Sequence, residues 1–256
     1  MNQNMQKIVL KKDPQLAPLL SIVIPVYNEA AKIRTDILAA DRFLSDNRFP
    51  GEIIVSDDGS EDTTLNAAQQ VREQISAPLH VLSCPRHNGK GAAVRRGMVF
   101  SSGLFVLFAD SGHCTPYHYS IDAMCLLQGG SCQLAHASRF MSNSEIVIPQ
   151  PLIRQWIGRL LRRLFPVLLP LPENLTDTQC GFKMYKGPQA RMIYQNLRCT
   201  GALFDLEVIL NARKHGCQIC EFPIQWKADP DSRTSFLNNI VKITTELISL
   251  FFRFRF

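Results

Sequence analysis

The chain has 256 residues, and its 46% hydrophobic content is enough to fill the core of one large domain or two small ones. Its formal net charge of +6 favours an anionic partner: a nucleotide, a nucleic acid or a phospholipid surface. No stretch has the apolar length of a signal peptide or of a membrane span, which needs roughly eighteen residues. We therefore expect a cytoplasmic protein without a transmembrane anchor, in which the eight cysteines are reduced.

The first half of the chain alternates short apolar runs with helical patterns. Four runs predict buried strands, at residues 19–26, 52–57, 79–84 and 105–109. The segments between them show the apolar spacing or the end signals of helices, near residues 33–44, 60–75 and 92–101. Strands that alternate with helices at this spacing indicate βαβ units, so we expect an α/β fold with a mainly parallel sheet flanked by helices.

The second half is less regular. We expect strands at residues 134–138 and 219–226, and helices near residues 117–127, 152–165, 203–215 and 236–252. Pro166 should end or kink the helix that precedes it. We divide the chain into an N-terminal extension (1–18), one domain (19–235), and a C-terminal amphipathic helix with its tail (236–256).

Polar residues follow the first four predicted strands where each strand ends. They are Tyr27-Asn28-Glu29, Asp57-Asp58, the segment from His87 to Lys90, and Asp110. In a parallel sheet these ends lie along one edge, where open α/β sheets bind their ligands. Each cluster alone fits a helix cap or a turn, but four on one edge favour a ligand site. Acidic side chains there can accept from ribose hydroxyls, and the glycine-rich turn around Lys90 can approach a phosphate.

Other site motifs are absent from the sequence. No G-x-G-x-x-G follows the first strand and no G-x-x-x-x-G-K-[ST] is present, which argues against a nicotinamide-binding fold and a P-loop NTPase. Cys217 and Cys220 form a single CxxC without a second pair, so we expect no zinc site. No nucleic-acid recognition motif is visible, so we expect no nucleic-acid partner.

Four separated segments resemble a known family. They are residues 21–29 (SIVIPVYNE), 55–62 (VSDDGSED), 88–98 (NGKGAAVRRGM) and 177–183 (DTQCGFK). In this order they resemble the family 2 glycosyltransferases of GT-A fold, and most of all the polyprenyl-phosphate sugar transferases of the dolichyl-phosphate glucosyltransferase type. The resemblance implies a Rossmann-like, mixed sheet. It also implies an inverting transfer from a nucleotide-sugar donor (UDP-glucose or GDP-mannose type) to a polyprenyl or dolichyl phosphate.

The resemblance also implies roles for individual residues. The nucleotide would lie against six of them: Pro25, Tyr27 and Glu29 at the base, Asp57 and Asp58 near the base and ribose, and Lys90 close to the pocket. Four others would serve the transfer itself: Asp110 as the metal anchor, which would also contact the nucleotide sugar, Gln179 with Asp177 facing the donor sugar, and Arg233 reaching the diphosphate or the acceptor phosphate.

The sequence departs from the family at the metal motif. Where the family has Asp-x-Asp, this chain has Asp110-Ser111-Gly112, so the second carboxylate is missing. Binding of a divalent cation, Mg²⁺ or Mn²⁺, would then rest on Asp110, the donor diphosphate and water. His113 lies one position late and suits manganese better than magnesium, but we favour the alternative that it only hydrogen-bonds within its loop.

The acceptor decides whether a catalytic base is needed. A lipid phosphate is already ionised at neutral pH, so the site must only align it with the anomeric carbon and stabilise the leaving diphosphate. A saccharide or other soluble acceptor would need a carboxylate base, for which Asp177 and Asp205 are the candidates. A third alternative, motivated by the incomplete metal motif, is a non-catalytic protein that only binds nucleotide sugars.

The predicted helix at residues 152–165 bears on membrane contact. It carries apolar residues at helical spacing together with four arginines: Arg154, Arg159, Arg162 and Arg163. Such a helix, like the C-terminal one that ends in FFRFRF, suits a membrane interface. The alternative is a helix that packs its apolar stripe on the domain core. We keep both interpretations, the first as peripheral contact with the cytoplasmic face of a membrane.

Overall fold

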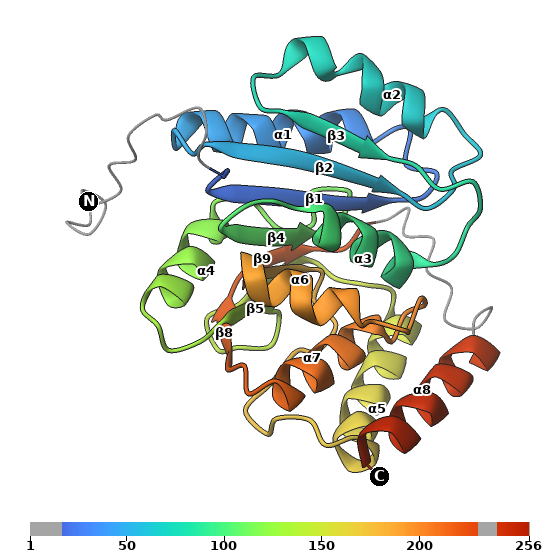
Figure 1. The fold of residues 1–256 in the computed structure, drawn as a ribbon. Helices are drawn as coiled ribbons and strands as arrows, with labels where there is room; N and C mark the ends of the chain where they lie inside the picture. Colours follow the sequence, from blue (N-terminus) through green and yellow to red (C-terminus); the bar gives the residue numbers. More distant parts are fainter. Residues whose placement is uncertain (1–16, 230–239, 256) are drawn as a thin grey trace.

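The computed structural model describes residues 17–229 and 240–255. Its centre is a seven-stranded sheet in the order β3-β2-β1-β4-β7-β5-β8 (Figure 1). The strands are β1 (Leu20–Val26), β2 (Gly51–Asp57), β3 (Leu79–Leu82), β4 (Phe105–Ala109), β5 (Leu134–Ser138), β7 (Phe182–Lys186) and β8 (Ile219–Pro223). Neighbouring strands among β1 to β4 pair in parallel, as do β5 and β8, so the predicted mainly parallel sheet is confirmed.

Strand β7 was not predicted from the sequence. It lies antiparallel between β4 and β5 and joins the two parallel parts of the sheet. Its sequence, FKMYK, places the fully buried Lys183 inside a strand whose other central residues are apolar. The lysine interrupts the continuous apolar run that is typical of a buried strand. A lysine is buried only when it has a partner, and that partner lies elsewhere in the chain, so the local sequence by itself does not predict the burial.

Helices cover both faces of the sheet. Helices α1 (Ile33–Asp46), α2 (Thr64–Gln70) and α4 (Tyr119–Gln128) pack on one face, and α3 (Lys90–Phe100), α6 (Gly187–Gln195) and α7 (Phe204–Lys214) pack on the other. Successive residues of β1 alternate between the two cores: Ile22 and Ile24 join the first and Val23 joins the second. This two-sided burial explains why the parallel strands are continuous apolar runs.

Two further helices, α5 (Leu152–Leu168) and α8 (Ile240–Arg255), lie at the outside of the second face (Figure 1). Phe165 of α5, with Ile243 and Leu250 of α8, packs into that core. Helix α5 continues past Pro166 for two residues, so the proline does not end the helix. No helix in the described part of the chain is long and apolar enough to cross a membrane.

The other differences from the predicted elements are local. Helix α2 ends at Gln70 and is followed by a 3-10 turn (Arg72–Gln74), so the predicted extension to residue 75 was wrong. The predicted strand at 219–226 is two strands, because β9 (Gln225–Lys227) leaves the main sheet after Pro223 and pairs with β6 (Glu145–Ile148). Strand β6 and helix α6 were not predicted, and the expected helix start at 236–239 lies outside the described residues.

Candidate functional site

The carboxyl ends of β1, β2 and β4 lie side by side at one edge of the sheet, with Val26 paired to Asp57 and Val23 to Phe108. The residues that follow these strands and β3 are brought together there. His87 contacts both Tyr27 and Asp58, and Lys90 contacts Asp110. The prediction that the four polar clusters share one edge is therefore confirmed. We call residues 27–29, 57–58, 87–90 and 110 the strand-end edge.

Asp57 and Asp58 shape the edge through backbone contacts. Asp57 accepts from the backbone amides of Gly59 and Ser60, which closes the turn after β2. The carboxylate of Asp58 accepts from the amides of Asn88 and Gly89 at 3.0 and 2.7 Å, and His87 Nδ1 lies 2.8 Å from it. Both aspartates are buried. Asp57 fixes the turn after β2, and Asp58 positions the glycine-rich turn.

Three other predicted nucleotide contacts differ in how open they are. The ring of Tyr27 is half-buried and contacts the His87 ring in a tilted arrangement, with centroids 4.1 Å apart, which leaves an aromatic surface at the edge. Pro25 is buried within β1, opposite Ser56 of β2. Glu29 is buried and its carboxylate lies 2.6 Å from Lys32 Nζ. Of the three, Tyr27 is the best placed to meet a ligand.

Lys90 and Asp110 form the charged centre of the edge. Lys90 begins α3 and its Nζ lies 2.6 Å from Oδ1 of Asp110, which directly follows β4. Burial alone would lower the pKa of Lys90, but the carboxylates of Asp110 and Asp205 outweigh it and raise that pKa above its usual value. The ammonium group is therefore charged at every physiological pH. It is the form that binds a phosphate.

Gly181 leaves room for the Asp110 carboxylate. The Asp110 amide donates to the Gly181 carbonyl at 2.8 Å, which holds the two segments together. A Cβ on Gly181 would lie 1.9 Å from Oδ2 of Asp110. No side chain fits at position 181 without displacing that carboxylate. This contact explains the glycine in the DTQCGFK motif by its approach to the metal-motif aspartate.

The loop after Asp110 is fixed from two sides. Gly112 has φ +84° and its amide donates to Asp36 Oδ2 at 2.8 Å. Burial raises the pKa of Asp36 to about 6, although the Gly112 hydrogen bond opposes the shift. A Cβ on Gly112 would lie 3.3 Å from the carboxylate of Asp229. At the position of the missing family carboxylate, the chain therefore presents a carboxylate from a distant segment.

Asp177, expected near the donor sugar, lies in a buried ion pair. Its oxygens accept from Nε and Nη2 of Arg139 at 2.7 and 2.9 Å, and one of them also accepts from the Gln179 amide. Burial would raise the pKa of Asp177, but Arg139 outweighs it and holds the pKa below its usual value. Asp177 thus orients the segment that carries Gln179. To act as a general base it would have to leave this pair.

Asp205, the other candidate base, is also paired. Lys183 of β7 donates to it and to the carbonyl of Thr178, and both charged side chains are buried. Burial raises the pKa of Asp205 even though Lys183 and Lys90 oppose the shift. The pair connects β7 with α7 behind the strand-end edge. It does not place a base at the surface.

Arg233, expected at the phosphates, lies outside the described residues. Within the described part of the chain, no group of three or more His, Cys, Asp and Glu side chains is placed to hold a metal ion. The carboxylates of Asp110 and Asp229 supply hard oxygen donors beside the 111–114 loop, and that of Asp229 is paired with Lys32 Nζ at 2.6 Å. This donor set fits a cation that is shared with a bound phosphate, and it does not fit one held by the protein alone.

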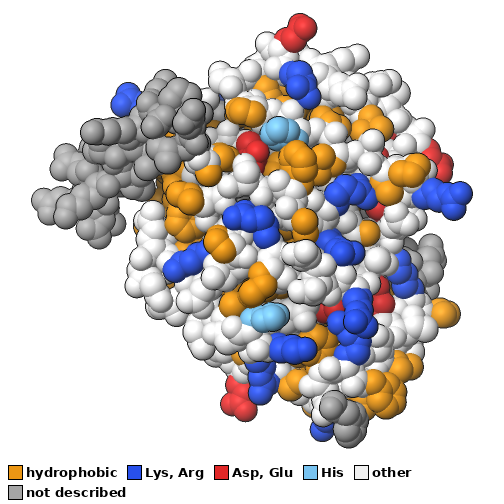
Figure 2. Space-filling model, viewed as in Figure 1, with side chains coloured by type: hydrophobic (Ala, Val, Ile, Leu, Met, Phe, Trp, Pro, Cys, Tyr) orange, Lys and Arg blue, Asp and Glu red, His pale blue; other side chains and the backbone are white. Residues whose placement is uncertain are grey.

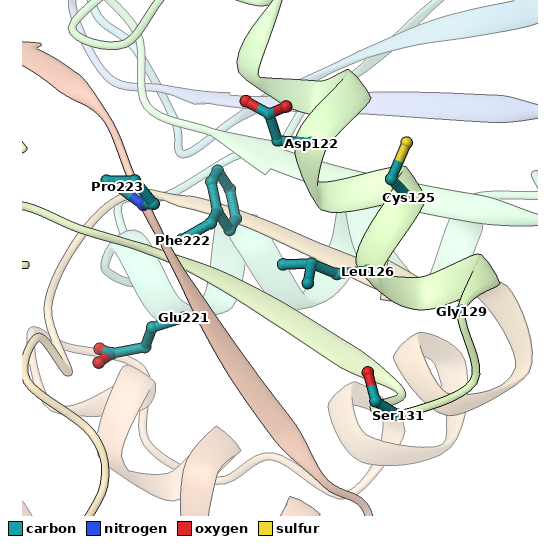
Figure 3. A pocket seen from close by; sticks show the side chains of 8 residues that line it. All are labelled: Asp122, Cys125, Leu126, Gly129, Ser131, Glu221, Phe222 and Pro223. Carbon is teal, nitrogen blue, oxygen red and sulfur yellow. The ribbon is translucent and has the colours of Figure 1, made fainter. Parts of the chain in front are cut away.

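One hollow in the described structure lies away from this edge. It measures about 450 Å³ and opens between α4 and β8, the last strand of the sheet (Figure 3). Leu126 and Phe222 form its apolar part, and Glu221 at its rim already accepts from the amides of Thr176 and Asp177. None of the predicted site residues lines it, so we place the site at the strand-end edge.

Several residues that shape the site were missed by the sequence reasoning. They are Asp36, Arg139, Lys183 and Asp229. Lys183 could have been recognised from the sequence, because a lysine within an apolar run of strand length requires a buried counter-charge. The other three could not, because each meets its partner across at least 38 residues of sequence.

Comparison with known proteins agrees with this geometry. Residues 21–185 match the family model of "Glycosyl transferase family 2". The chain is 27% identical to the dolichyl-phosphate beta-glucosyltransferase of Dictyostelium discoideum, over 96% of this chain and 78% of that protein. It is 30% identical to the enzyme of the same name from Saccharomyces cerevisiae, over 90% and 73%.

A solved structure shows the same fold. The glucosyl-3-phosphoglycerate synthase of Mycobacterium tuberculosis, in complex with Mn²⁺, UDP and glucosyl-3-phosphoglycerate, superposes with a TM-score of 0.66 at 21% identity. The match covers 91% of this chain and 78% of that one. The GT-A fold expected from the sequence motifs is therefore confirmed. With its family motifs gathered on one sheet edge, the chain belongs to glycosyl transferase family 2.

Proposed function

We propose that this glycosyltransferase moves a hexose from a nucleotide-sugar donor to a polyprenyl phosphate. We favour glucose over mannose as that hexose. The observation that carries the proposal is the Lys90–Asp110 pair, which sets a cation and a metal-binding carboxylate beside a glycine-rich turn. Two relatives are dolichyl-phosphate beta-glucosyltransferases by name, which supports glucose as the sugar and a lipid phosphate as the acceptor.

The donor nucleotide would lie along the strand-end edge. The tilted Tyr27–His87 ring pair offers an aromatic surface for the base. Lys90 and the amides of the turn approach the diphosphate, in the way that glycine-rich turns at helix N-termini bind phosphate. Gln179, on the segment that Asp177 and Arg139 orient, faces the sugar.

A divalent cation would join Asp110 to the donor diphosphate. The Mycobacterium tuberculosis structure holds Mn²⁺ together with UDP, which supports a divalent cation but leaves the choice between Mg²⁺ and Mn²⁺ open. Asp110 would hold the ion, with Asp229 as the second carboxylate beside Gly112. When bound, the ion would offset the charge that develops on the leaving diphosphate.

The charged pairs behind the edge favour an acceptor that is already ionised. A hydroxyl acceptor needs a base, but Asp177 is held by Arg139 and Asp205 by Lys183. A phosphate oxygen needs none. The residues of the edge then only align that oxygen with the anomeric carbon and stabilise the leaving group. Attack opposite the diphosphate inverts the anomeric centre.

Helix α5 supplies a surface for a lipid acceptor. Its apolar residues recur at helical spacing. Leu161, Phe165 and Leu168 pack on the core, while a stripe of other apolar side chains faces solvent. The side chains of Leu152, Trp156, Leu160 and Val167 are 72%, 65%, 66% and 69% exposed. The alternative that the stripe packs on the core is therefore wrong for these residues. A helix with this arrangement suits the boundary between headgroups and acyl chains.

The charge of α5 favours an anionic membrane surface. The helix contains four arginines and no carboxylate. Arg159 and Arg163 are exposed, and the Arg159 guanidinium lies 4.8 Å from the centre of the Trp156 ring. Figure 2 shows basic and hydrophobic side chains intermixed over the lower half of the face in view. We propose peripheral contact here with the cytoplasmic face of a membrane.

Transfer assays test the activity. We would measure sugar transfer from UDP-glucose, UDP-GlcNAc and GDP-mannose to a polyprenyl phosphate, with magnesium or manganese. The matched controls are the unphosphorylated polyprenol and a soluble saccharide. Transfer to the phosphate alone is expected. Transfer to the saccharide would instead support a soluble acceptor, and no transfer from any donor by a folded protein would refute the proposal.

Vesicle sedimentation tests the membrane surface. The double variant Trp156→Ser/Leu160→Ser should bind vesicles with anionic lipid several-fold more weakly, because it removes apolar area that would insert. Leu104→Ser is the control, since Leu104 is also exposed, at 54%, but lies outside α5. Equal binding of the two variants would show that α5 does not contact the bilayer.

A further inference from the structure

Helix α8 connects the outside of the molecule with the glycine-rich turn. It lies beside α5 in Figure 1, and Arg255 at its end donates to the backbone carbonyl of Val167 in α5 at 3.0 Å. At its start, Lys242 Nζ donates to the carbonyl of Asn88 at 3.3 Å. The same helix therefore contacts the exposed α5 and the turn that carries Lys90.

The inner side of α8 is fixed to the body by polar contacts. Glu246 accepts from the amides of Gly201 and Leu203 at 2.6 and 3.3 Å. Arg253 pairs with the buried Glu207 at 2.6 Å. Lys242, Glu246 and Arg253 lie along one side of the helix, because they are spaced by about one and two turns. This side holds α8 against the segments that border the site.

The glycine-rich turn is held between two groups of contacts. Asp58 binds the amides of Asn88 and Gly89 from the sheet side. On the other side, the Gly91 amide donates to the Thr200 carbonyl at 2.8 Å, and the place of a Cβ on Gly89 is 3.0 Å from Lys242 Nζ. Residues 199–203 are in turn fixed to α8 through Glu246. Docking of α8 thus restrains the segment that would bind the diphosphate.

The outer side of α8 is apolar and open. Val241, Ile248 and Phe252 are 74%, 51% and 63% exposed, and their spacing of about two turns and one turn places them on one face. Glu246 is the carboxylate within α8 and its oxygens bind backbone amides of the body. This face adjoins α5, whose exposed stripe is flanked by arginines. An anionic bilayer matches both the apolar area and the charge.

We infer that α8 is a membrane-responsive clamp: an anionic bilayer stabilises the docked helix, and Lys242 transmits this to the 88–91 turn, which then binds the donor nucleotide more tightly. The inference rests on the proposed function. A bilayer favours the docked helix because only that state presents the α8 and α5 stripes together. A turn that is already ordered loses less conformational freedom on binding a diphosphate.

Nucleotide titration with and without vesicles tests the clamp. The full chain is titrated with UDP and with GDP, alone, with neutral phosphatidylcholine vesicles, and with vesicles that contain phosphatidylglycerol. The anionic vesicles should lower the Kd of the bound nucleotide by about fivefold or more, the usual range of coupling between two sites. Because such coupling is reciprocal, the nucleotide should strengthen vesicle binding by the same factor.

Two variants separate the steps. Phe252→Ser should keep the Kd measured without vesicles and lose the vesicle effect. Lys242→Ala should keep vesicle binding but lose the decrease in nucleotide Kd that anionic vesicles cause. Lys214→Ala, which removes the same charge from the exposed end of α7, is the control and should behave as the wild type. An equal nucleotide Kd with and without anionic vesicles, or full tightening in Lys242→Ala, overturns the clamp and leaves the proposed function standing. If neither nucleotide binds under any condition, the proposed function fails and the clamp with it.

Discussion

Lys90 and Asp110 are joined by an ion pair of 2.6 Å, although one residue begins a helix and the other directly follows a strand. Both side chains remain partly exposed, 41% for Lys90 and 29% for Asp110, so a ligand can reach each of them. In the function proposed above, a diphosphate would compete with Asp110 for the ammonium group, and a divalent cation would compete with Lys90 for the carboxylate. The pair holds both groups in place for that exchange.

Replacement of the carboxylate tests its part in catalysis. Asp110→Asn should lower kcat by about a hundredfold or more, because it removes the proposed metal anchor at the leaving group. Its melting temperature should change little, since a partly exposed ion pair contributes little to stability. Asp122→Asn, which removes a carboxylate from α4, is the control for charge removal. A near wild-type rate in Asp110→Asn would show that Asp110 does not anchor the metal.

Gly181→Ala tests the position of the same carboxylate without removing it. The new Cβ would lie 1.9 Å from Asp110 Oδ2, so the carboxylate must move. A displacement of a catalytic group by about 1 Å typically costs about a hundredfold in rate. Gly158→Ala is the matched control, because a methyl group there meets nothing within 4 Å. Steady-state kinetics of the two variants would decide. Comparable activity in both would mean that the site tolerates a shifted Asp110.

The Arg139–Asp177 pair should matter for stability. Asp177→Asn leaves a buried guanidinium without its counter-charge, which typically costs about 3–5 kcal/mol in the free energy of unfolding. Urea denaturation measures this. Asp46→Asn, which removes an exposed carboxylate at the end of α1, should stay within about 0.5 kcal/mol of the wild type. A loss below about 1 kcal/mol in Asp177→Asn would contradict a structural role for the pair.

Asp36 should make stability fall as pH rises. Its folded pKa of about 6 lies above the ordinary value of 3.8, so the folded state holds the proton more tightly than the unfolded state. The protonated Asp36 therefore stabilises the folded state. This contribution to the free energy of unfolding is complete below about pH 4 and is lost as pH rises through 6. Asp36→Asn has no such titration. Its stability relative to the wild type should therefore increase by up to about 3 kcal/mol between pH 4 and pH 8.

Urea denaturation of both proteins at several pH values measures this difference. Contributions of the other titrating groups largely cancel between them, because both chains share those groups. The side-chain oxygen of the introduced asparagine would still accept from the Gly112 amide, so the loop should keep its conformation. A difference that stays constant across this pH range would show that Asp36 does not titrate as its burial predicts.

The amino-acid sequence by itself determined the parallel part of the sheet and the composition of its edge. Buried parallel strands are continuous apolar runs, and the polar residues that end them are adjacent in sequence, so both can be recognised locally. Tyr27, Asp57, Asp58, Lys90 and Asp110 were placed together on this basis, and the structure confirms that placement. The family motifs strengthened the same conclusion.

Only the tertiary structure decided which partners the charged groups have and which surfaces stay open. Asp229 reaches the Gly112 loop, and Lys183 finds Asp205, through contacts between segments that no local pattern connects. Helical spacing shows that α5 is amphipathic, but it cannot tell whether the apolar stripe meets a core or solvent. That depends on which other helices cover the sheet. Here α3, α6 and α7 cover it. Phe165 of α5 still packs on that core, but apolar residues such as Trp156 and Leu160 are left exposed.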